Sequence, residues 1–426
     1  MEVGNSGRRE CVIRQIDVRL RSDIRKGEAK LMNQPTVVIE TCRPETANEN
    51  VAAQVAEMLS KLPDFAAHLD RAKRIFIKLN LGVGRAPMYK GRPVTHTDPV
   101  VFEGLAKFLA DKTEAKVLVG DGCCGITPKE AARKRGHMAI IEANGYQFVD
   151  LHQPPYARFD VPHPTMFRWY QMAETLKDVD LWISVAKMKA HHLCGVTLTM
   201  KNLFGLPPSP IYGYPRGALH SAIRLPGILA DLTQLCTPAI GIIDGIIGGN
   251  YREWDSDPVT SGVLIAGENL VATDAVGARF MGADPQADRG TPPFIRADNH
   301  INLASEVGLG PADLSKLTLD GRMPTERRPF GVEGGAEPEV PEEAEQHRAT
   351  VSALAQWYFD ERECFVEAYE GQTIVLGNRK VLIEDAKGLN PTQIFKILAE
   401  EKLALYETFF KRVEAEEAEL QIPYGC

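Results

Sequence analysis

The chain lacks the cysteine patterns that a self-contained metal or iron–sulfur site requires. It has no C-x-x-C pair and no ferredoxin-type run. The scatter of its cysteines along 426 residues is also unlike the dense disulfide framework of a small secreted domain. We therefore expect reduced thiols and no iron–sulfur motif. The eight cysteines are Cys11, Cys42, Cys123, Cys124, Cys194, Cys236, Cys364 and Cys426.

Long apolar runs and an excess of positive charge are also missing. No run approaches transmembrane length, and the opening segment MEVGNSGRRECVIRQ is too polar for a secretion signal. Lysine and arginine number 49 against 57 aspartates and glutamates, which gives a net charge of −8. Such a chain is a poor general binder of nucleic acids or membrane surfaces. The sequence predicts a cytoplasmic protein without nucleic-acid or membrane partners.

The composition, 44% hydrophobic and 25% charged, is that of a globular protein with a large core. At this length two domains are the expected number. We expect a polar arm at 1–34, in which helical and strand spacing fit equally well. An α/β catalytic region of one or two lobes follows at 35–321, then an acidic, proline-rich linker at 322–346 and a small α+β domain at 347–426.

Short apolar strands alternate with helices through the central region. This pattern is typical of mostly parallel sheets with helices on both faces, an α/β fold. Asp98-Pro99 and Thr127-Pro-Lys-Glu130 have the form of helix N-termini. The expected strands lie at 36–40, 74–80, 116–120, 146–151, 181–185, 239–244 and 263–266, and further helices lie at 51–62 and after Asn269. The C-terminal domain should contain a helix at 355–370, a strand pair at 373–383 and a helix at 391–419.

Polar side chains gather just after the predicted strands, where ligands bind in parallel α/β sheets. The segment 185–205 is the densest, with three lysines, two histidines and no acid. Cations grouped without acids are typical of an anion site, and crowding favours proton transfer near neutrality. The alternative is that the lysines reach solvent and one histidine caps a helix. The residues placed after strands are Lys78, Asn80, Asp121, Cys123, Cys124, Lys187, Lys189, His191, His192, Asp244 and Asp274.

Two further groups have both a functional and a structural interpretation. Cys123 and Cys124 suit a metal or redox site, and equally a buried position. Asp244 and Asp274 would share a divalent cation if their strand ends adjoin, whereas Asp274 alone would suit a helix cap. Asp121 would hydrogen-bond a ligand or stabilise a tight turn.

The sequence resembles the domain-of-unknown-function family 362 from about residue 36 to residue 285. That resemblance implies a prokaryotic, cytoplasmic α/β protein, often with a ferredoxin-type segment that is missing here. The chain also has Ala186 where the family usually has proline. The motifs that carry the resemblance are Lys78-Leu-Asn80, Thr97-Asp-Pro99, Gly120-Asp-Gly122, Lys187-Met-Lys-Ala-His191, Gly195-Val-Thr197, Lys201-Asn-Leu-Phe-Gly205, Ile243-Asp-Gly245 and Thr273-Asp-Ala-Val276.

A remoter similarity is to the nickel-pincer lactate racemases. Their family has a histidine ten positions before a cofactor-holding lysine with a glycine between, as His191, Gly195 and Lys201 are spaced. Arg92-Pro93 resembles another of their segments, but a cysteine follows the Gly-Asp-Gly turn where they have histidine. This resemblance implies acid–base chemistry at the carbon beside a carboxylate.

These residues support three hypotheses. The first is an isomerase or lyase acting on a small anionic carboxylate or phosphate metabolite, with His191, Lys201 and His220 as catalytic residues. The second gives the same pocket a divalent metal or nickel-type cofactor, with Cys123, Cys124, His191 and His220 as ligands. The third is a non-catalytic anion-binding or assembly protein. The C-terminal domain would cover the site or form a homo-oligomer. The substrate-binding residues of the first hypothesis are Lys78, Asn80, Arg92, Asp121, Lys187, Lys189, His192 and Asn202.

Overall fold

The chain divides into two units, Met1–Gln34 and Pro35–Cys426. The computed structural model describes residues 34–83, 86–213, 216–217, 219–253, 256–324, 330–331, 341–386, 391–403, 407–413 and 415. The expected arm at 1–34 and much of the expected linker at 322–346 therefore lie outside the described residues. Every described helix and strand belongs to the second unit.

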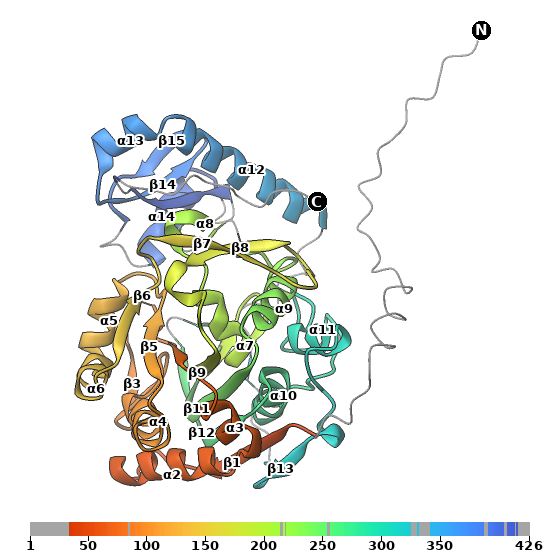
Figure 1. The fold of residues 1–426 in the computed structure, drawn as a ribbon. Helices are drawn as coiled ribbons and strands as arrows, with labels where there is room; N and C mark the ends of the chain where they lie inside the picture. Colours follow the sequence, from red (N-terminus) through yellow and green to blue (C-terminus); the bar gives the residue numbers. More distant parts are fainter. Residues whose placement is uncertain are drawn as a thin grey trace. The chain divides into compact units, whose positions relative to one another are not determined.

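A nine-stranded mixed sheet forms the centre of this unit (Figure 1). Its order is β13-β1-β12-β11-β9-β2-β5-β6, and β10 pairs with β9. The run β11-β9-β2-β5-β6 is parallel throughout, while β12 is antiparallel to both of its neighbours. The strands are β1 (Thr36–Thr41), β2 (Arg74–Leu79), β5 (Lys116–Asp121), β6 (Gln147–Asp150), β9 (Leu181–His191), β10 (Gly195–Thr197), β11 (Ala239–Asn250), β12 (Asp257–Gly267) and β13 (Thr318–Asp320).

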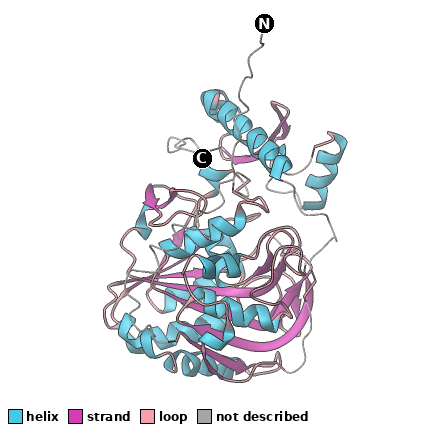
Figure 2. Cartoon of the chain, turned by 90° about the vertical axis from the view of Figure 1, so that its right-hand side faces the viewer, coloured by secondary structure: helices cyan, strands magenta, loops and turns pink. Residues whose placement is uncertain are grey.

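Helices cover both faces of the sheet, because its central strands are apolar on both sides. In β2, Ile75 and Ile77 belong to one hydrophobic core and Phe76 to the other. Figure 2 shows the strands of the sheet with helices around them. The first core includes residues of α2 (Asn48–Ser60), α3 (Pro63–Leu69), α4 (Pro99–Lys112), α5 (Pro128–Lys134) and α6 (His137–Ala143). The second includes residues of α7 (Thr199–Asn202), α8 (Ser209–Tyr212), α9 (Leu225–Leu235), α10 (Leu270–Phe280) and α11 (His300–Glu306).

Smaller elements complete the unit. β3 (Met88–Tyr89) pairs with β4 (Arg92–Pro93), and β7 (Tyr156–Asp160) pairs with β8 (Trp169–Ala173). Three single turns of 3-10 helix occur at Glu174–Leu176, Leu203–Gly205 and Leu314–Lys316. The described residues from 341 to 415, here called the C-terminal unit, contain α12 (Pro341–Asp360), α13 (Arg362–Tyr369), α14 (Pro391–Glu400) and the sheet β15 (Lys380–Ile383), β14 (Thr373–Gly377) and β16 (Phe409–Arg412).

The predicted α/β class is confirmed, as are the helix starts that rest on local chemistry. The Asp98 side chain accepts a hydrogen bond from Val100 N at the start of α4, and Thr127 accepts one from Glu130 N at the start of α5. Local caps can be predicted because donor and acceptor are two or three residues apart.

Three expectations about elements were wrong. The strands expected at 181–185 and 239–244 continue to His191 and Asn250. The helix expected at 391–419 ends at Glu400, and Phe409–Arg412 instead forms the edge strand β16. Part of the expected linker is helical, since α12 begins at Pro341. For the strands, pairing with other strands overrides the local pattern: β9 pairs with β10 and β11, and β16 pairs with β14.

Helices α2 and α4 pack closely at Gly104. A Cβ there would lie 2.6 Å from Ala52 O and 2.8 Å from Val55 Cβ. We expect Gly104→Ala to lower the free energy of unfolding by ~1–3 kcal/mol through overpacking, although alanine favours a helix by about 1 kcal/mol. Glu103→Ala, at a more exposed position of the same helix, is the control. Denaturant unfolding measures both, and a Gly104→Ala variant as stable as wild type would contradict the close packing.

Candidate functional site

Strand β9 places three of the candidate residues on one face. Side chains alternate along a strand, so Lys187, Lys189 and His191 point to the same side, and β9 is buried along its whole length. The sequence placed these residues just after a strand that ends at residue 185, but they belong to the strand itself. A helix-capping role for His191 is therefore excluded.

Lys78 is buried in an ion pair with Asp121 at the ends of β2 and β5. Its Nζ lies 2.5 Å from Asp121 Oδ1 and 3.4 Å from Asn202 Oδ1. Asp121 also accepts hydrogen bonds from Leu81 N and Gly122 N. Burial lowers the pKa of Lys78, and Asp121 opposes that shift.

Gly205 permits this ion pair to lie beneath the chain that follows α7. A Cβ at Gly205 would come within 2.6 Å of Lys78 Nζ and 2.9 Å of Asp121 Oδ1. Glycine is therefore required by a close approach, and the motif Lys201-Asn-Leu-Phe-Gly205 packs directly on Lys78.

A second buried ion pair joins Lys187 to Asp244 at 2.8 Å, with both side chains fully buried. Asp244 also accepts a hydrogen bond from Asp98 N, and the Asp98 carboxylate pairs with Arg92 at 3.1 Å. Arg92 donates further to Pro44 O and Thr46 O, so the structure gives it a bracing role. Burial raises the pKa of Asp244, and Lys187 opposes that shift.

The expectation of lysines without acidic partners was thus wrong for Lys187. Its aspartate lies 57 residues further along the chain and meets it only because β9 and β11 are parallel neighbours in register. Charge pairing between adjacent strands is not visible in a local stretch of sequence.

Lys189 is different, because among the described residues it has no carboxylate partner. Its Nζ donates to Thr95 O at 2.9 Å and to Asn80 Oδ1 at 3.2 Å. Asn80 Nδ2 in turn donates to Asn202 Oδ1, which links Lys189 to the Lys78 pair. Burial lowers the pKa of Lys189 to about 7, while Glu253 raises it and Lys201 lowers it further. This amine is therefore suited to exchange protons near neutrality.

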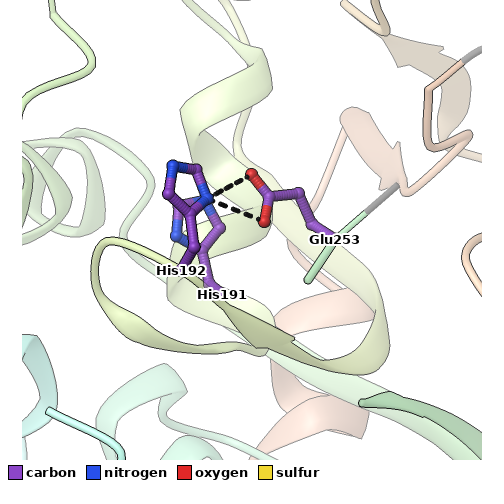
Figure 3. Close-up of side chains that lie close together, drawn as sticks. All are labelled: His191, His192 and Glu253. Atoms are coloured by element: carbon purple, nitrogen blue, oxygen red, sulfur yellow. Dashed lines mark hydrogen bonds and ion pairs between the residues drawn. The ribbon is translucent and has the colours of Figure 1, made fainter. Parts of the chain in front are cut away.

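The rings of His191 and His192 are stacked, with their centroids 5.2 Å apart. Figure 3 shows the carboxylate of Glu253 facing the two rings. Glu253 Oε1 lies 3.5 Å from His191 Nε2 and 3.0 Å from His192 Nδ1. Burial lowers the pKa of His191 well below its ordinary value. The neighbouring imidazoles hold the pKa of Glu253 well below its usual range, against the effect of burial.

The other ring nitrogen of His191 fixes its tautomer. Nδ1 accepts hydrogen bonds from the backbone N–H groups of Leu193 and Cys194, at 3.2 and 3.3 Å, in the turn between β9 and β10. A neutral imidazole that accepts at Nδ1 carries its proton on Nε2. His191 is therefore a donor directed at Glu253, and it has no free lone pair for a metal ion or a substrate proton.

Three basic side chains surround the ring of Phe204. Lys201 Nζ lies 4.5 Å from the ring centroid and the Arg216 guanidinium 5.8 Å. The His220 ring lies 5.3 Å from Phe204 and 5.4 Å from His191, centroid to centroid. Burial lowers the pKa of both Lys201 and His220. This group, Lys201, Phe204, Arg216 and His220, is called the Phe204 cluster below.

Arg216 and Lys201 differ in how they are held. The Arg216 guanidinium donates to the carbonyl oxygens of Pro207, Gly122 and Gly205, and to Cys124 Sγ at 3.5 Å. Lys201 has no hydrogen-bond or ion-pair partner among the described residues. Its amine is therefore the available cation of the Phe204 cluster.

The described residues predicted as metal ligands, which are Cys123, Cys124, His191, His220, Asp244 and Asp274, do not gather into one group. Cys123 Sγ contacts Ile126 O, and burial raises its pKa well above the ordinary value. Cys124 lies beside Arg216 and Ser209. Over the described part of the chain, the His, Cys, Asp and Glu side chains close enough to hold one ion are His191, His192 and Glu253, with ligand atoms within 4.8 Å of one another. His191 is the one predicted ligand in that group, which does not include Cys123, Cys124, His220, Asp244 or Asp274.

Asp274 caps α7, as the structural interpretation proposed. Its carboxylate accepts hydrogen bonds from Thr199 N, Thr199 Oγ1 and Met200 N at 2.5–2.9 Å. Burial raises the pKa of Asp274 to about 7, against those hydrogen bonds. Both oxygens are therefore occupied in starting the helix that carries Lys201 and Asn202, and Asp244 has separate partners.

Two residues of the site were missed. Glu253 supplies the carboxylate that the histidines face, and its signal was an acid in the glycine-rich segment 248–254 after a strand. Arg216 gave a weaker signal, an arginine within the glycine- and proline-rich segment 213–217. Nothing local indicated that it would hold the turn after β5.

The fold and this edge of charged side chains define an α/β protein with a candidate site at the carboxyl ends of its parallel strands. Residues 75–279 match the model of the family described as Domain of unknown function (DUF362), a span shorter than the expected 36–285. A thylakoid-associated protein of Synechocystis sp. is 25% identical over 257 residues, which cover 60% of this chain and 76% of that protein.

A solved structure of a Thermotoga maritima protein also aligns with the chain. It is 14% identical, with a TM-score of 0.33, and the alignment covers 52% of this chain and 57% of that chain. A likeness this distant carries no argument about function. Among the described helices, none has both the length and the apolar character that crossing a membrane requires.

The lowered pKa of Lys189 predicts a pH dependence of stability. Its pKa falls from 10.5 to about 7 on folding, so its contribution is present above 10.5 and is lost as the pH falls through 7. Relative to Lys189→Met, the wild-type protein should therefore gain stability as the pH rises from 7 to 10. Lys107→Met, at an exposed lysine, is the control. Urea unfolding measures all three proteins, and parallel curves for wild type and Lys189→Met would contradict the shift.

Proposed function

We propose that this protein is an enzyme that performs acid–base chemistry on a small anionic carboxylate or phosphate metabolite. The observation that carries the proposal is the buried amine of Lys201, which has no hydrogen-bond or ion-pair partner among the described residues. Burying a polar group without a partner costs free energy. A substrate anion that binds there would recover that cost.

Charge balance supports an anionic ligand. Three of the candidate cations are neutralised within the fold, since Lys78, Lys187 and Arg92 each pair with an aspartate. Lys189, Lys201 and Arg216 have no carboxylate partner in the described part of the chain, and Glu253 is the remaining carboxylate near them. The candidate residues thus include more basic groups than carboxylates, and a carboxylate or a phosphate bound among them would stabilise their protonated forms.

Lys201 and His220 are the proposed proton-transfer groups. Both contact the ring of Phe204. Burial lowers the pKa of each, which increases the fraction of neutral, basic side chain at neutral pH. Two such groups on one aromatic ring suit isomerisation, racemisation or elimination, in which a proton leaves carbon and one returns to carbon or to a leaving group. Lys189 would hold the anion in its protonated form, which a nearby anion stabilises, and His191 would orient the site instead of acting as a base.

A carbon-acid exchange assay tests the proposal. Wild-type protein is incubated in D2O with lactate, malate and phosphoglycerate, and loss of the proton beside the carboxylate is followed by NMR. We expect exchange with at least one probe and a loss of ~100-fold or more in Lys201→Met, the usual size of an acid–base contribution. Lys107→Met is the matched control for removal of a lysine.

Two results would contradict the proposal. Undiminished exchange in Lys201→Met would remove that residue from the reaction. If the probes bind to the wild-type protein and none exchanges, the non-catalytic anion-binding alternative is favoured.

A metal-dependent enzyme is the second candidate, favoured by the close approach of His191, His192 and Glu253. By resemblance to the nickel-pincer lactate racemases, Lys201 would hold a nickel-type cofactor, and its amine has no hydrogen-bond or ion-pair partner in the described part of the chain. The tautomer of His191 opposes a metal ion, because its Nε2 proton would first have to leave. The nearby Lys201 also disfavours a bound cation.

We therefore expect calorimetric titration of the metal-free protein with Zn²⁺ to show no saturable site that depends on Glu253. The wild-type protein and Glu253→Gln are compared, because the amide retains the size of the side chain and removes its charge. One-site binding to the wild-type protein that disappears in Glu253→Gln would establish the metal centre instead.

The cytoplasm remains the proposed location, because the scattered cysteines of the chain suit a reducing compartment. The Synechocystis relative is named for its association with thylakoids. A peripheral association of this chain with a membrane is therefore the alternative that fractionation of cells would distinguish.

A further inference from the structure

The C-terminal unit contacts the main fold through a fully buried lysine. Lys411, in β16, donates from Nζ to Pro210 O in α8 at 2.5 Å. The same Nζ lies 5.2 Å from the ring centroid of Tyr358 and 5.7 Å from that of Phe359, both in α12. The ammonium is thus held between the aromatic side chains of α12 and a carbonyl of α8.

The residue that follows α8 also packs on β16. Gly213 has φ +79°, and a Cβ there would come within 2.7 Å of the Phe409 ring. Tyr212, beside it, accepts a hydrogen bond from Gln171 N of β8 at 2.7 Å. The end of α8 is therefore enclosed, with β16 on one side and β8 on the other.

Hydrogen bonds continue from Gly213 to two members of the Phe204 cluster. Arg216 N donates to Gly213 O, and Arg216 O accepts from Leu219 N at 2.8 Å and His220 N at 3.0 Å. Arg216 has φ +70°, a conformation that costs a residue with a side chain about 1 kcal/mol or more. Its surroundings must therefore hold it, and they include Pro207 O and Gly213 O, on either side of α8.

We infer that the C-terminal unit is a structural part of the candidate site, and that Lys411 is a positioning residue for Arg216 and His220. The role differs from covering the site or forming an oligomer, because the unit acts through the backbone from Pro210 to His220. Its importance for catalysis rests on the proposed function. The positioning itself does not.

Hydrogen exchange and histidine labelling of the full chain test the inference. Lys411→Met removes the bond to Pro210 O and keeps an apolar side chain between the aromatic rings. We expect amide exchange in peptides covering 209–220 to increase by about tenfold or more, and labelling of His220 by diethyl pyrocarbonate to accelerate. Lys380→Met is the matched control, since Lys380 is an exposed lysine of the same small sheet, paired with Glu401.

Wild-type exchange and labelling in Lys411→Met would overturn the inference. If the substitution unfolds the C-terminal unit, amide exchange will rise throughout 341–415. Amide exchange in 209–220 still tests the inference in that case. Unchanged protection of 209–220 would then also overturn the inference, whereas loosened peptides support it. Phe409→Leu removes part of the ring that packs against Gly213 and is a second, independent variant. We expect it to increase amide exchange in 209–220 as well.

This experiment is separate from the carbon-acid assay. If 209–220 loosens and no probe exchanges, the positioning stands and the proposed reaction fails. If a probe loses its carbon-bound proton and the amides of 209–220 stay protected in Lys411→Met and Phe409→Leu, the proposed reaction stands and the positioning fails.

Discussion

The desolvation of lysine amines at the carboxyl edge of the sheet is the constraint on which the rest of the structure depends. A buried ammonium is stabilised when it pairs with a carboxylate, when it loses its proton or when it binds an anionic ligand. The structure shows the first outcome at Lys78 and Lys187, each paired with an aspartate from a neighbouring strand end. Lys189, with a pKa of about 7, shows the second. Lys201 is the amine left for the third.

These outcomes divide the edge into a rigid part and an available part. The ion pairs, with Asn80 and Asn202 between them, join β2, β5, β9 and α7 into one polar network. The Phe204 cluster lies beside this network, and its Lys201 amine has no hydrogen-bond or ion-pair partner among the described residues. A site with fixed surroundings and a few free groups suits catalysis, because positioned groups need no reorganisation when a substrate binds.

The histidines show why composition alone is a poor guide to role. His191 was a catalytic candidate by sequence, yet both of its ring nitrogens are engaged, one by backbone N–H groups and one by Glu253. His220, also a candidate by sequence, has a half-buried ring near Lys201. What a histidine can do is set by the partner of each nitrogen.

The sequence by itself determined the α/β class, the strand and helix order of the central region and the helix caps at Asp98 and Thr127, because these depend on local periodicity and on contacts two or three residues apart. It also indicated which edge of the sheet carries polar side chains. Only the tertiary structure decided the partners: the aspartate beside Lys187, the approach of Glu253 to His191 and the contact of Lys411 with α8. Those pairs are separated by 57 to 201 residues, and no local pattern encodes which strands become neighbours.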